Sequence, residues 1–184
     1  MSKAALKKEL NTFTGEELVK VVLDVYDASK EAKQFLEYFL NPDPEALFEK
    51  KCALIEKELG RVKRGYCRAR ISVIKAAIKE FGAYGVGPEY MCRLMAYAVE
   101  QMALKFNYMH YTDAYIDSVY KFTGNYIYYA NDNGLLTQAM DGIKQIVDSK
   151  KCTARYGMFL RETAATAVKS IADGLKWPQY NTSV

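Results

Sequence analysis

The chain has 184 residues, of which 50% are hydrophobic and 26% charged, a composition typical of a globular domain and not of a disordered or fibrous chain. Its formal net charge of +4 is spread over both halves, which excludes a basic tail or an acidic arm. Cys52, Cys67, Cys92 and Cys152 show no metal-ligand or redox spacing, so we expect reduced, mostly buried thiols. No uninterrupted apolar stretch approaches about 18 residues, and none follows the charged first ten residues. We therefore expect a cytoplasmic protein with no membrane association.

Apolar residues recur at helical spacing along nearly the whole chain, which predicts an all-α protein. Thr14 and Glu17 have the spacing of a capping box, and Ser29, Asp43 and Ser72 stand where further N-caps are expected. In chain order, helices are predicted over 3–10, from Thr14 to about 28, from Ser29 to 40, from Pro44 to 59, from Ser72 to 81, from Pro88 to 106, from Thr112 or Asp113 to 130, over 136–147 and over 154–175.

These elements predict one domain, residues 1–184, built from about eight or nine helices. The connections are short, which favours antiparallel neighbours and hence a bundle or a short stack of helical hairpins. Two stretches fall outside the helices: a basic loop over about 61–71 and a C-terminal tail over about 177–184.

The basic loop and the helix after it form the sharpest charge cluster in the chain. Between positions 60 and 79 there is no acidic residue, and the basic ones are Arg61, Lys63, Arg64, Arg68, Arg70, Lys75 and Lys79. The N–H groups at a helix start favour anions, and arginine adds fork-shaped donors. We therefore predict an anion or nucleic-acid site made by Arg64, Arg68, Arg70, Ser72 and Lys75. The alternative is a solvated loop, or cations paired with acidic residues of a neighbouring helix.

Tyrosine is concentrated between positions 108 and 129, where seven of the fifteen tyrosines lie. Positions 126, 128 and 129 cannot share one helical stripe, so we expect one set of rings in the core and another partly exposed. Exposed tyrosine favours protein interfaces, and Tyr108, Tyr111, Tyr120 and Tyr128 are the predicted interface residues. Two alternatives remain: rings that line a wet groove, and rings that stack on unpaired bases.

Catalytic and metal-binding patterns are missing from the sequence. His110 is the single histidine, and a partly buried ring near a helix junction is its expected role. There is no phosphate-loop, zincin or nucleophile-elbow motif, and Asn107 stands where a di-iron bundle would need a glutamate. We expect no enzyme activity, no metal and no cofactor.

The N-terminal half resembles a known family. The segments LKKEL (6–10), EELVKVVLDVYDASKEAKQFLEYFLNP (16–42), EALFEKKCALIEKEL (45–59) and IKAAIKEF (74–81) resemble, in this order and spacing, the bacterial domain of unknown function numbered 6155. The resemblance covers about residues 3–110. It implies a small, cytoplasmic, bacterial helical protein, and it assigns no catalytic or binding residue.

Two functions follow as expectations. The first is a non-enzymatic module that binds a protein partner or a second copy of itself through the tyrosine-rich face. The second is an anion- or nucleic-acid-binding protein that uses the basic loop.

Overall fold

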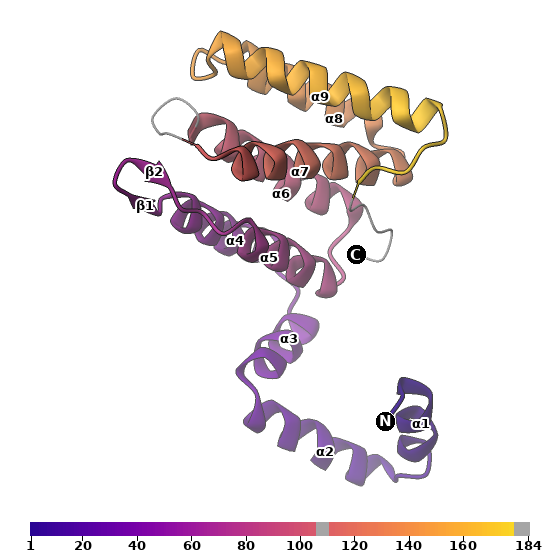
Figure 1. The fold of residues 1–184 in the computed structure, drawn as a ribbon. Helices are drawn as coiled ribbons and strands as arrows, with labels where there is room; N and C mark the ends of the chain where they lie inside the picture. The colour runs from indigo at the N-terminus through magenta and orange to yellow at the C-terminus, as the bar shows by residue number, and fades with distance from the viewer. Residues whose placement is uncertain (106–110, 179–184) are drawn as a thin grey trace. The chain divides into compact units, whose positions relative to one another are not determined.

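The computed structural model describes residues 1–105 and 111–178 (Figure 1). In these residues the chain forms nine α-helices and one ribbon of two short antiparallel strands, so the predicted all-α fold is confirmed. The chain divides into two compact units, an N-terminal unit (Met1–Asp43) and a C-terminal unit (Pro44–Val184). The single domain expected from the sequence stays a prediction.

The N-terminal unit consists of three helices: α1 (Lys3–Leu10), α2 (Gly15–Ala28) and α3 (Lys30–Leu40). Local sequence accounts for each helix start. The Thr14 hydroxyl accepts from the Glu17 backbone N–H, while the Glu17 carboxylate accepts from the Thr14 N–H at 2.7 Å, which completes the predicted capping box. Ser29 caps α3 by accepting from the Ala32 N–H. The helices of this unit are therefore well specified at their ends.

The C-terminal unit contains the other elements: α4 (Pro44–Leu59), β1 (Val62–Lys63), β2 (Tyr66–Cys67), α5 (Ile71–Ala83), α6 (Pro88–Lys105), α7 (Asp113–Asp132), α8 (Leu136–Asp148) and α9 (Ala154–Ala172). The helices stack in pairs, with α4 beside α5, α6 beside α7, and α8 beside α9 (Figure 1). The middle pair is thus covered from both sides, and its α7 packs against α6, α8 and α9. This is the stack of helical hairpins expected from the short connections.

The core lies between these layers. Its fully buried side chains come from every helix pair and include Ile55, Leu59, Phe81, Leu94, Met102, Val119, Ile127 and Leu160. The first and second layers are also joined by Arg93 of α6, whose guanidinium donates two 2.7 Å hydrogen bonds to Glu45 of α4 and lies 4.1 Å from the ring centroid of Phe48.

Two predicted helix boundaries were wrong. Helix α5 begins one residue before Ser72, so Arg70 is the N-cap and the Ser72 side chain makes no cap bond. Helix α9 ends at Ala172 instead of Leu175, because Gly174 adopts φ +66° and the Leu175 N–H bonds back to the Ser170 carbonyl. That geometry is a Schellman end, which glycine favours over a residue with a Cβ.

Candidate functional site

The basic segment forms a β-hairpin, not the irregular loop predicted from the sequence. Val62 pairs with Cys67 and Lys63 pairs with Tyr66, and the Arg68 N–H donates to the Arg61 carbonyl. The two turn residues, Arg64 and Gly65, both have positive φ, at 53° and 79°. Two such residues in succession match the twist of a two-residue hairpin. The ribbon could not be predicted from the sequence, because strands of two residues show no alternation.

Glu58 of α4 fixes the base of this hairpin. Its carboxylate is buried, and it accepts from the Arg70 backbone N–H at 2.8 Å and from the Arg70 guanidinium at 2.9 and 2.7 Å. Arg61, at the other end of the hairpin, lies 3.3 Å from the same carboxylate. The hydrogen bonds from the Arg70 side chain lower the pKa of Glu58 to about 2, against the opposing effect of burial. One carboxylate therefore holds both ends of the ribbon to α4.

The five predicted anion-site residues do not all lie in one place or remain available. Arg70 forms an ion pair with Glu58. Ser72 is exposed within the first turn of α5, and Lys75 is half-buried and already engaged in an interaction. Arg64 and Arg68 remain exposed on the hairpin. The five residues therefore do not form the predicted cluster at a serine-capped helix start, and the alternative of an acidic partner on a neighbouring helix holds for Arg70.

Lys63, which is not among the five predicted anion-site residues, is a third exposed cation of the hairpin beside Arg64 and Arg68. In a strand, residues two apart point to the same face. Lys63 is paired with Tyr66, and Tyr66 is two residues from Arg68, so Lys63 and Arg68 share the face opposite the buried Cys67. Arg64 stands at the tip between the strands. Only the register of the pairing reveals this face.

The tyrosine-rich helix α7 is mostly interior. Tyr115, Tyr126 and Tyr128 are buried, and burial raises the pKa of all three hydroxyls. Tyr128 donates a 2.8 Å hydrogen bond to the Leu175 carbonyl, so its predicted place on an exposed surface is wrong. Both faces of α7 are buried because the helix lies in the middle layer of the stack.

Two more of the predicted interface tyrosines are half-buried. The Tyr111 ring stacks on Tyr115 at a centroid distance of 5.3 Å, and the Tyr120 ring lies 4.9 Å from Trp177. Tyr108 and His110 lie outside the described residues. The tyrosines that the structure describes therefore do not offer the open aromatic face expected from the sequence.

The chain after α9 folds back onto α7 through Trp177. The indole is buried, and its Nε1–H donates a 3.1 Å hydrogen bond to the Lys121 carbonyl. It lies against Gly124, where a Cβ would overlap the ring. Trp177, the first residue of the predicted C-terminal tail, therefore packs against α7 and covers part of the core.

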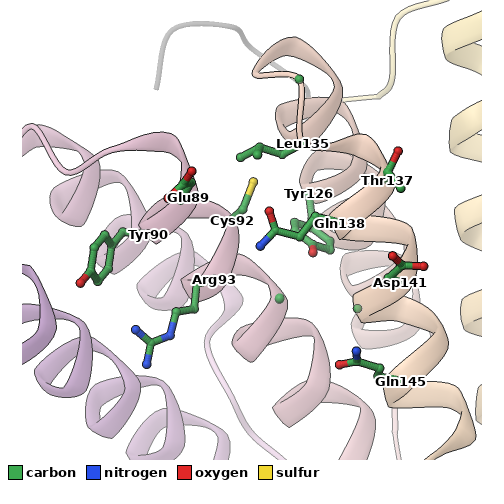
Figure 2. A pocket seen from close by; sticks show the side chains of 13 residues that line it. Glu89, Tyr90, Cys92, Arg93, Tyr126, Leu135, Thr137, Gln138, Asp141 and Gln145 are labelled. Atoms are coloured by element: carbon green, nitrogen blue, oxygen red, sulfur yellow. The ribbon is translucent and has the colours of Figure 1, made fainter.

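A groove of about 940 Å³ lies between α6 and α8, with Tyr126 of α7 at its floor (Figure 2). Cys92 and Arg93 belong to the α6 wall, while Gln138 and Asp141 belong to the α8 wall. Arg93 is already paired with Glu45, and burial raises the pKa of Cys92 to about 11, so its thiol is protonated near neutral pH. The groove contains none of the residues predicted for the anion site.

Across 1–105 and 111–178, no three His, Cys, Asp or Glu side chains gather in a way that could hold a metal ion. In the same part of the chain, no helix has both the length and the apolar character required to cross a bilayer.

The N-terminal unit carries the largest group of exposed apolar side chains. All its residues are described, and none is buried. The exposed large apolar residues of its three helices, between 36% and 73% accessible, are Leu6, Leu18, Val19, Val22, Leu23, Val25, Phe35, Phe39 and Leu40. At about 100° per residue, the apolar positions of α2 span an arc of roughly 200°. One neighbouring helix cannot cover an arc of that width.

By its fold, the protein is an all-α stack of helical hairpins that carries one basic β-hairpin. The model of a family of unknown function, DUF6155, matches residues 1–156, and the chain belongs to this family. The match extends well beyond residues 3–110, where the resemblance was seen in the sequence. No curated protein and no solved structure matches the chain. The bacterial origin implied by the resemblance stays a prediction.

Proposed function

We propose that the protein is a non-enzymatic helical module that associates with a second copy of itself through the N-terminal unit. The observation that carries the proposal is that three capped helices leave nine large apolar side chains exposed and bury none. Isolated helices of 8 to 14 residues are marginal in water, and most helical stability in proteins comes from packing of the apolar face. The unit therefore needs a surface to pack against.

The exposed apolar area has the size of a protein interface. Taking about 170 Å² for a whole apolar residue, the exposed fractions of the nine residues amount to roughly 800 Å². A standard interface buries about 800 Å² on each partner. A two-fold contact between identical units would therefore reach the usual size without residues from elsewhere.

Charge favours a second copy over a membrane surface. Helices α2 and α3 together hold three lysines against six acidic residues, whereas α1 holds three lysines against one glutamate. Helices that lie on anionic membranes are rich in Lys and Arg on the polar face. In a two-fold pair, α1 of each copy can approach the acidic α2 and α3 of the other, which is the self-complementarity that an isologous contact requires.

The test is the mass in solution, measured by light scattering after size exclusion over a range of protein concentrations. The wild type is expected at twice the 20.9 kDa of one chain. The double variant Val19→Glu/Leu23→Glu places two charges on the apolar arc of α2 and is expected to be monomeric. The matched control is Met158→Glu/Leu175→Glu, in which two side chains of similar exposure are changed in the C-terminal unit. It should remain a dimer.

A monomeric wild type at every concentration would refute self-association, and a dimeric Val19→Glu/Leu23→Glu variant would refute the assigned surface. Circular dichroism adds a second readout. Without a partner surface, the helices of the N-terminal unit should lose helicity in the monomeric variant, because they bury no side chain of their own.

We further propose that the protein works in the cytoplasm and has no catalytic role. The four cysteines support this, since all are free thiols, as is usual for proteins of a reducing compartment. Three of these thiols, those of Cys52, Cys92 and Cys152, have raised pKa values through burial, which favours inert structural cysteines over nucleophiles.

A further inference from the structure

The charges at the end of the β1–β2 hairpin are not neutralised by any residue that the structure describes. Lys63, Arg64 and Arg68 are exposed, and none of them takes part in an ion pair with another described residue. Glu58, the acidic residue at the hairpin's base, is already bonded to Arg70 and Arg61. The hairpin therefore presents to solvent three positive charges that pair with no acidic residue in the described part of the chain.

The backbone that carries these three cations is held in place by the fold. The hairpin is fixed at both ends by Glu58, and the inward side chain of Cys67 is buried. The Arg68 N–H to Arg61 carbonyl bond, at 2.9 Å, continues the ladder beyond the two strand pairs. A ligand that binds the outer face therefore does not have to order the backbone first, which reduces the entropic cost of binding.

The arrangement of the cations suits an extended anion. Lys63 of β1 and Arg68, the residue after β2, lie on the outer face of the hairpin, and Arg64 extends the row to the turn. A single small anion would be bound by groups that converge on one point, whereas this row runs along a narrow ribbon. A two-stranded ribbon is also slim enough to enter the major groove of a duplex.

We propose that this hairpin face binds the sugar–phosphate backbone of a nucleic acid through Lys63, Arg64 and Arg68. Phosphates provide closely spaced negative charges along one line, and arginine binds them as a fork. The same face also exposes the ring of Tyr66, the cross-strand partner of Lys63, and a cationic surface with an aromatic ring on which a base can stack is typical of nucleic-acid binding. The proposal does not depend on self-association, which involves a different unit of the chain.

The experiment is fluorescence anisotropy with the full chain and three labelled probes: a 20-base-pair duplex DNA, a single-stranded RNA of 20 nucleotides, and a poly-glutamate peptide. The test variant is Lys63→Gln/Arg64→Asn/Arg68→Gln. Asparagine is chosen at position 64 because it tolerates a positive φ better than most residues do. The control is Lys144→Gln/Lys150→Gln/Arg155→Gln, which removes three exposed cations of the C-terminal unit that have no ion pair in the described chain.

Three phosphate contacts predict a slope of about −2.7 for log affinity against log salt on duplex DNA, and hence an affinity roughly 40-fold weaker at 200 mM than at 50 mM. The hairpin variant should lose at least about 50-fold in affinity at 100 mM salt, with a slope near zero. The control, with the same net charge, should retain the wild-type slope. Circular dichroism and the emission of Trp177 should be the same for all three proteins.

Three results would overturn the proposal. Equal losses in the hairpin variant and the control would mean that bulk charge drives binding. Binding of poly-glutamate as tight as that of either nucleic acid, with the same dependence on the hairpin, would assign the face to acidic polypeptides. Flat curves for both nucleic acids at 50 mM salt would exclude a nucleic-acid site. The preference between duplex DNA and single-stranded RNA then identifies the form that is bound.

Discussion

Replacing Gly124 by alanine should displace Trp177 from α7. A Cβ at this position would overlap atoms of the Trp177 indole ring, and because a Cβ is fixed to the helix backbone, the ring has to move. Truncating a buried Trp costs about 3–5 kcal/mol, and the indole hydrogen bond to Lys121 adds about 1 kcal/mol. Alanine regains about 1 kcal/mol of helix propensity. We therefore expect Gly124→Ala to lower the free energy of unfolding by about 3–5 kcal/mol.

Urea unfolding followed by circular dichroism measures this loss, and Trp177 emission reports its cause because the chain has one tryptophan. The wild-type emission should be blue-shifted, and that of Gly124→Ala should be close to the emission of the unfolded chain. The control is Gly142→Ala in α8, where a Cβ would lie 3.5 Å from the Tyr126 hydroxyl, an ordinary contact. That variant should be as stable as the wild type or up to about 1 kcal/mol more stable.

A double-mutant cycle with Trp177→Ala decides whether the two residues act through each other. Once the ring is absent, alanine at position 124 has nothing to displace, so Gly124→Ala/Trp177→Ala should be no less stable than Trp177→Ala. The coupling free energy should be at least about 3–5 kcal/mol, well above the level expected for independent sites. Additive losses, or a Gly124→Ala variant with wild-type emission and stability, would refute the reasoning.

Three other perturbations follow from local geometry. The pKa of Glu58 is lowered from 4.5 to about 2. The stability that its carboxylate contributes should therefore be complete above pH 4.5 and be lost as the pH falls toward 2. Glu58→Gln should flatten the dependence of the urea midpoint on pH in that window. Arg64→Asn should raise stability by a few tenths to about 1 kcal/mol in the same unfolding assay, because φ +53° strains arginine more than asparagine, and an unchanged midpoint would contradict this. Phe81→Ala should cost about 3–5 kcal/mol, since the ring is fully buried between the layers; a loss below 1 kcal/mol would mean that the site is not close-packed.

Helix positions could be predicted from the sequence because their causes are local. The Thr14–Glu17 box lies within one turn, and the apolar spacing of each helix records the face that it buries. The hairpin could not be predicted in the same way. Its turn is Arg64-Gly65 in place of the usual Asn-Gly, and its anchor, Glu58, lies twelve residues before Arg70 in the sequence.

The burial of Tyr128 depends on a residue still farther away. The sequence shows that Tyr126, Tyr128 and Tyr129 must point in different directions, but not that several directions are interior. The layers on both sides of α7 decide this, together with a segment that returns after α9 to place Trp177 and the Leu175 carbonyl. A helical stripe predicts which residues can be buried together, whereas the number of buried faces depends on tertiary neighbours.

The end of the family match does not coincide with the end of a folded unit. The match stops at residue 156, near the start of α9, whereas α9 continues to Ala172 and contributes Leu160, Ala164 and Ala167 to the core. A fragment cut at that boundary would lose one helix of the outer layer and expose the apolar surface of α7 and α8 beneath it. Exposed patches of this kind cause aggregation. Fragments made for expression or partner screening should therefore extend at least through Trp177, whatever the limits of the sequence family.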